Sequence, residues 1–236
     1  LKIIGRAAVS FYEELFFYFL AGIPHLICWL LVIPGPFALA GIYTIGQRAV
    51  RGKGVKWRLI WEGVKEFGLR SFALFLITLV GYAIIAANLV FYNSPELSPF
   101  SRQVAFWVTP IFVLLGVVWT GIVFYAQSFL MELKQPTIWL ALRNSFFLVM
   151  LKPLPTLAWL IVSAVAIVLS VLLPVLILVA PGFISVLSLT AVRTLIGDLT
   201  ERVEAMEEEE EEALEDQTTS EDVTANLQHS PYEPTS

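Results

Sequence analysis

Long apolar runs separated by short polar loops are the dominant pattern of the first 197 residues. Residues 72–92 and 105–126 are the clearest runs, and each reaches the roughly 20 residues that a helix needs to cross a hydrocarbon core about 30 Å thick. Residues 156–195 are too long for one crossing and carry Arg193 as their only charge. This stretch predicts two spans with a tight hairpin near Pro174 or Pro181-Gly182, because proline interrupts a helix.

The N-terminal apolar region predicts two further crossings, one of them short. Residues 15–33 contain Pro24 and end at Pro34-Gly35-Pro36, which stops a helix. Residues 35–51 extend roughly 25 Å as a helix, enough to cross a locally thinned bilayer or to re-enter without crossing. We favour a crossing, since it places Lys2 and Arg6 on the same side as the basic loop that follows. The sequence therefore predicts an all-α, polytopic transmembrane bundle of about six spans.

Three other segments have helical periodicity and are expected to be interfacial amphipathic helices. Residues 57–67 place two tryptophans and Ile60 on one face and charged side chains on the other. Residues 138–151 form a similar segment around Trp139, and residues 1–14 form a shorter one. Such segments are typical of the membrane surface, where tryptophan lies at the depth of the headgroups.

Charge is distributed unevenly along the chain. Residues 1–197 hold 14 Lys+Arg and 6 Asp+Glu, a net charge of +8, whereas residues 198–236 hold 1 and 14, a net charge of −13. Cations that flank membrane spans are retained in the cytoplasm, and the six-span topology places 13 of the 14 body cations there, leaving only Arg102 outside. We therefore expect a multi-pass protein of a bacterial plasma membrane, with both termini cytoplasmic.

One loop concentrates this positive charge and is the candidate surface for anionic lipid headgroups or a partner protein. It lies between two apolar runs, so its cations also set the orientation of the neighbouring spans. The candidate binding residues of this basic loop are Arg48, Arg51, Lys53, Lys56 and Arg58.

The last part of the chain has a different composition. Residues 198–236 include six consecutive acids, Glu207 to Glu212, and almost no large apolar side chains. Such a segment buries too little surface to offset its chain entropy. We therefore expect two parts, a transmembrane helical domain at 1–197 and an acidic cytoplasmic tail at 198–236 that is disordered beyond about residue 213. We expect the acidic run to serve solubility, or to bind the basic loops of the chain itself or a basic protein.

Motifs that carry catalytic chemistry are missing from the sequence, so we do not expect an enzyme. There is no glycine-rich phosphate loop, no HExxH, no CxxC and no GxSxG. Two histidines and one cysteine, Cys28, are too few for a histidine- or cysteine-rich metal site. We expect no cofactor and no metal.

His25 is the one ionisable side chain deep within a predicted span. An intramembrane ionisable group is a candidate for a proton path or a ligand site. The alternative is a neutral imidazole bonded to a carbonyl that Pro24 leaves free. Asn88 is the second candidate for an intramembrane polar site, and Gln47 and Gln127 either line a polar path with it or bond helix to helix.

The stretch IPGPFALAGIYTIGQRAVRGKGVKWRLIWEGVKEF resembles the YesL-like family of uncharacterised bacterial multi-pass membrane proteins. The resemblance lies in Gly35-Pro36 at the end of the first span, the small-residue helix from Ala38 to Gly46, the Arg48 to Gly52 loop and the aromatic segment from Trp57 to Phe67. It implies an accessory role beside a carbohydrate-uptake system. The long acidic tail departs from the compact family pattern.

Two functions are compatible with these features. The first is an accessory or scaffolding membrane protein, linked to carbohydrate or solute uptake, that binds the bilayer, anionic headgroups and a transporter or other membrane protein. The alternative is a small solute transporter or channel with a polar path near His25 and Asn88. No nucleic-acid partner is expected.

Overall fold

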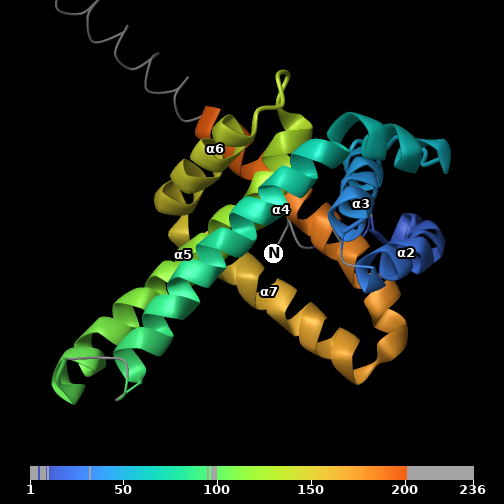
Figure 1. Ribbon diagram of the computed structural model, residues 1–236. Helices are drawn as coiled ribbons and strands as arrows, with labels where there is room; N and C mark the ends of the chain where they lie inside the picture. The colour runs from blue at the N-terminus through green and yellow to red at the C-terminus, as the bar shows by residue number, and fades with distance from the viewer. Residues whose placement is uncertain are drawn as a thin grey trace, which may run out of the picture. The chain divides into compact units, whose positions relative to one another are not determined.

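The computed structural model describes residues 5, 9, 11–31, 33–94, 96 and 100–200, and all regular structure in this part of the chain is helical. Its elements are α2 (Leu15–Leu30), α3 (Gly35–Val50), α4 (Arg58–Asn93), α5 (Arg102–Glu132), α6 (Ile138–Leu151), α7 (Pro153–Leu172) and the 3₁₀ helix η1 (Pro174–Leu178). A further helix, Ala180–Thr200, ends the described part. The predicted all-α membrane bundle is confirmed (Figure 1).

Four of these helices are long and apolar enough to cross a membrane, namely α4, α5, α7 and Ala180–Thr200. Large apolar side chains on α4, α5 and α7 point outward, as in a bundle that faces lipid, whereas most of Ala180–Thr200 is buried among the other helices. Examples are Phe106 at 70% and Ile161 at 63% exposure. The protein is therefore membrane-embedded.

Helices α2 and α3 account for the N-terminal apolar region and are shorter, with 16 residues each. A helix of this length extends about 24 Å, less than the roughly 30 Å of a hydrocarbon core. The turn between them is at Pro34, as the sequence predicts. Helix α2 belongs to the shorter apolar helices, together with α6.

Helix α4 joins two segments that the sequence analysis treats separately. The amphipathic residues from Arg58 and the apolar run 72–92 form one continuous 36-residue helix. Its first turns pack along α3, since an added Cβ at Gly63 would meet Thr44 and one at Gly68 would meet Phe37. These close approaches explain why the amphipathic turns lie against the bundle as well as at its surface.

Helices α4 and α5 then run side by side as a long hairpin (Figure 1). Gly81 admits the Trp119 ring of α5, and the Tyr82 and Thr120 hydroxyls are 3.0 Å apart. Near the hairpin tip, the Asn93 amide donates to the Thr109 hydroxyl at 2.9 Å. Polar side chains on this hairpin therefore bond helix to helix.

The second half of the body confirms two further predictions. Helix α6 begins at Ile138 and ends at Leu151, the limits of the second predicted amphipathic segment. The long apolar run breaks at Leu173, before Pro174, and η1 connects α7 to the last helix. Of the two predicted hairpin positions, the break is therefore at Pro174, whereas Pro181 lies in the first turn of the next helix, where proline costs no hydrogen bond.

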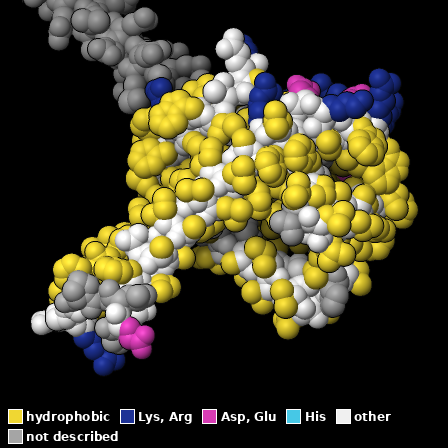
Figure 2. Space-filling view, viewed as in Figure 1, with side chains coloured by type: hydrophobic (Ala, Val, Ile, Leu, Met, Phe, Trp, Pro, Cys, Tyr) yellow, Lys and Arg dark blue, Asp and Glu magenta, His cyan; other side chains and the backbone are white. Residues whose placement is uncertain are grey.

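The chain divides into two units, Leu1–Arg193 and Thr194–Ser236. The first unit is the helical body described above. The acidic run and the disorder predicted beyond residue 213 lie outside the described residues, as do most of residues 1–14. Lys and Arg gather on the body at the end where α4 begins, and a second small charged group lies at the tip of the α4–α5 hairpin (Figure 2).

Candidate functional site

The basic loop forms a cationic surface, but its five candidate residues are not equivalent. Arg48, Lys53 and Lys56 are exposed and have no ion pair within the described residues. Arg58 pairs with Glu62 one turn along α4, with 2.9 Å between Nε and Oε1. Arg51 also forms an ion pair, since its Nη2 lies 3.0 Å from Glu132 Oε2. The cations available to an external anion are therefore Arg48, Lys53 and Lys56.

Glu132 is the centre of a three-member ion cluster. It accepts from Arg51 at the end of α3 and from Arg193 on the last helix, whose Nε and Nη2 are 3.0 and 2.9 Å from Oε1. The Glu132 side chain is 17% exposed, so the charges attract in a medium less polarisable than water. Next to it, Gln47 donates to the Met131 carbonyl at 2.6 Å. The cluster fixes one edge of the basic surface to the body.

This cluster was not predicted from the sequence, in which Glu132 lies at the end of an apolar run with no marked partner. The signal that points to it is Arg193, alone in an apolar run, because a charge at such a position needs a partner. The partner comes from 61 residues earlier in the chain, a separation that helical periodicity does not reveal.

Buried polar side chains also connect the helices of the body. Gln127 donates to the Ser71 hydroxyl at 2.5 Å, joining α5 to α4. Ser188 donates to the Phe124 carbonyl at 2.6 Å, and its hydroxyl lies 2.6 Å from that of Ser128. Gln47 and Gln127 therefore bond helix to helix, one of the two interpretations left open for them, and Gln127 also lines a pocket.

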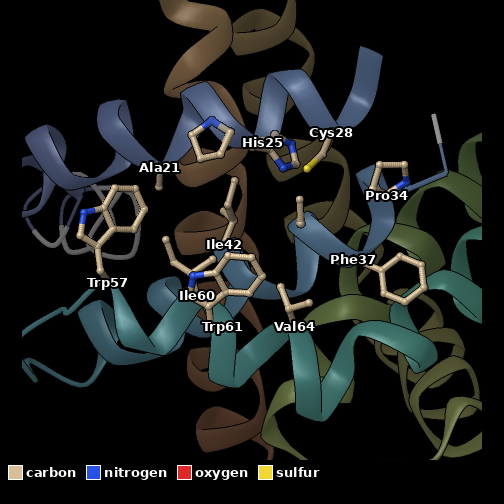
Figure 3. A pocket seen from close by; sticks show the side chains of 12 residues that line it. Ala21, His25, Cys28, Pro34, Phe37, Ile42, Trp57, Ile60, Trp61 and Val64 are labelled. Atoms are coloured by element: carbon tan, nitrogen blue, oxygen red, sulfur yellow. The ribbon is translucent and has the colours of Figure 1, made fainter. Parts of the chain in front are cut away.

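An apolar groove of about 530 Å³ lies between α2 and α4, with α3 as its floor. Figure 3 shows Trp57 at one end, Pro34 and Phe37 at the other, and the His25 and Cys28 side chains entering from the α2 wall. Trp57 and Trp61 are 45% and 67% exposed, so the groove opens toward the surroundings of the bundle. Its lining residues are Ala21, Pro24, His25, Cys28, Pro34, Phe37, Ala38, Ile42, Trp57, Ile60, Trp61 and Val64.

A second pocket of about 380 Å³ shares His25 with the groove. Polar side chains converge on it, namely His25, Tyr43, Ser71, Thr78 and Gln127. His25 is 6% exposed, and its Nδ1 has no hydrogen-bond partner within the described residues. The imidazole therefore separates two cavities and carries a buried polar atom whose hydrogen bond is unmade, which is costly in a low-dielectric interior.

Asn88, the second candidate for the intramembrane polar site, lines neither of the two cavities that His25 borders. Its side-chain amide donates to the Ile84 carbonyl of its own helix at 2.8 Å. It borders a shallow surface depression with Ala86, Ala87 and Phe91, near the far end of α4. The apolar run around Asn88 predicts that this residue lies within a span. It does not predict which face of α4 points to the interior.

Within the described residues, no three His, Cys, Asp or Glu side chains are grouped as metal ligands would be. No family model, no curated protein and no solved structure matches the chain. The resemblance to the YesL-like family therefore stays a prediction. The structure defines the class, an all-α membrane bundle with a basic end, an apolar groove and a second pocket that shares His25 with the groove.

Proposed function

We propose that the protein is an accessory or scaffolding component of a bacterial plasma membrane that holds anionic lipid and a membrane partner at its basic end. The observation that supports this proposal is that some cations at this end are paired within the protein and others are not. Arg51 and Arg193 are used to fix the end of the body through Glu132, whereas Arg48, Lys53 and Lys56 are left for an external anion. A non-enzymatic role linked to carbohydrate or solute uptake is part of this proposal.

The exposed aromatic side chains beside these cations support the same proposal. Trp57 follows Lys56 directly and Trp61 lies about one helical turn further on, and tryptophan favours the depth of the headgroups. Cations at that depth attract the anionic lipids of the cytoplasmic leaflet by about 1 kcal/mol each. The two features together support an anion-binding surface at the inner face of the membrane.

Neutralising the free cations tests this function. We expect the triple variant Arg48→Gln, Lys53→Gln, Lys56→Gln to lose most of its enrichment in phosphatidylglycerol over phosphatidylethanolamine, because about 3 kcal/mol of attraction is removed. The measurement is mass spectrometry of the phospholipids retained by the full chain after purification. A membrane partner that copurifies through this surface should also be lost.

Arg102→Gln, at the opposite end of the hairpin, is the control and should keep the enrichment. Wild-type enrichment in the triple variant would refute the proposal.

The second pocket favours a second function, a small solute transporter or channel. His25, Ser71 and Gln127 border one cavity, as a polar path across a bundle requires. Shrinkage and re-swelling of proteoliposomes in ribose, followed by light scattering, tests for such a path. A transporter predicts re-swelling faster than in protein-free liposomes and its loss in Gln127→Leu. Equal rates in the two preparations would count against it.

A further inference from the structure

The two ends of the groove between α2 and α4 differ in charge, and this difference indicates the chemistry of its occupant. At one end Trp57 lies between two basic neighbours, Lys56 and Arg58. At the other end, Pro34 and Phe37 contribute no charge (Figure 3). An occupant that matches both ends has an anionic head and an apolar tail.

We propose that this groove holds one acyl chain of an anionic glycerophospholipid, whose phosphate lies against Lys53 and Lys56. The inference rests on the proposed function, because it names the lipid site within the basic end. The acyl chain runs from Trp57, at headgroup depth, toward Phe37. A cavity of about 530 Å³ lies within the range that small amphiphilic ligands fill.

The His25 imidazole is a second, independent feature that favours a ligand with a polar group in the groove. Its side chain enters the groove from α2 (Figure 3), and its Nδ1 has no partner in the described part of the chain. In the hydrocarbon region a polar atom without a partner is costly, whereas an ester oxygen of the glycerol region accepts a hydrogen bond from a protonated Nδ1. An occupant that is pure hydrocarbon, such as an alkane, leaves this nitrogen unsatisfied.

Charge complementarity distinguishes this site from general attraction to the membrane surface. Lys53 and Lys56 are exposed, and neither has an ion pair within the described residues. Lipid tails surround the whole bundle, so an acyl chain gains little from hydrophobicity by entering the groove. Preference for one lipid must therefore come from its headgroup and from the fit of its chain.

The chain contains a residue whose reactivity reports whether the groove is occupied. Cys28 is its only cysteine, and it lines the groove. The experiment uses the purified full chain, delipidated in detergent, with dioleoylphosphatidylglycerol or dioleoylphosphatidylcholine added. Alkylation of Cys28 by N-ethylmaleimide is followed by intact mass. We expect phosphatidylglycerol to slow alkylation and phosphatidylcholine to leave it unchanged at the same concentration.

The decisive comparison uses two variants that lose the same charge. Lys53→Gln with Lys56→Gln should weaken protection by phosphatidylglycerol about 30-fold in concentration, since each lysine near a headgroup contributes about fivefold. Lys134→Gln with Lys152→Gln removes two cations elsewhere in the body and should leave protection unchanged. Ala38→Phe, which fills the groove, should abolish the lipid dependence, and its melting temperature verifies that it is folded.

The outcomes separate this inference from the proposed function. Equal protection by both lipids overturns the assignment of an anionic headgroup. Equal weakening by the two lysine pairs also overturns it, since binding is then spread over the surface, but it leaves a basic lipid-binding end intact. Lipid enrichment unchanged in the Arg48, Lys53 and Lys56 variant refutes the proposed function itself.

Discussion

Replacing Glu132 by Gln lowers the stability of the body by about 2 kcal/mol. Loss of one member of a fully buried ion pair costs roughly 3–5 kcal/mol, because the other charge is left without compensation. The figure expected here is smaller, since the Arg51 and Arg193 side chains are 39% and 28% exposed and water screens them. The two arginines are also left close to each other, which adds repulsion. The measurement is the free energy of unfolding of the full chain in mixed micelles.

A matched control separates this effect from the mere loss of a carboxylate. Glu62→Gln removes the same charge from the exposed pair with Arg58, whose side chains are 87% and 48% exposed. A helical pair of this kind contributes about 0.3–0.5 kcal/mol. Equal stability losses in the two variants would show that the Glu132 cluster has no special role.

The second large effect is expected at Gly22, where α2 crosses η1. A Cβ added there would meet the backbone carbonyl of Leu178, and backbone cannot move aside as a side chain does. Gly22→Ala should therefore destabilise the body by about 1–3 kcal/mol, the usual cost of overpacking. Thermal unfolding monitored by tryptophan fluorescence measures the change.

Gly116 in α5 is the control for this substitution. The nearest atom to a Cβ built there is Ile85 Cγ2 at 3.8 Å, an ordinary contact. Gly116→Ala should stabilise the helix by about 0.5–1 kcal/mol, because alanine loses less backbone freedom on folding. A stabilising Gly22→Ala would mean that α2 does not pack on η1 as described.

The periodicity of the sequence predicts the long helices well, because membrane spans are strongly apolar and their ends are marked by proline and charge. The limits of α6 and the break at Pro174 both follow from local signals. Helix α4 shows where local signals fail. The change from amphipathic to apolar near Arg70 suggests two segments, but no residue there interrupts the helical hydrogen bonds.

The candidate site was less predictable, since its parts come from distant positions. Arg51 meets Glu132 across 81 residues, and periodicity gives no pairing at such a distance. Arg51 therefore belongs to a structural cluster, although the sequence groups it with the free cations. His25 was identified by its depth alone. Its position between two cavities depends on α3 and α4, which only the tertiary structure brings beside it.

The orientation of the basic end is the point on which the account depends most. In a Cys28→Ala background, single cysteines at Lys53 and Arg102 are labelled with a membrane-impermeant maleimide on intact bacterial cells that express the full chain. We expect labelling of Arg102→Cys on intact cells and of Lys53→Cys only after the membrane is permeabilised. Labelling of Lys53→Cys on intact cells, with Arg102→Cys protected, would contradict it.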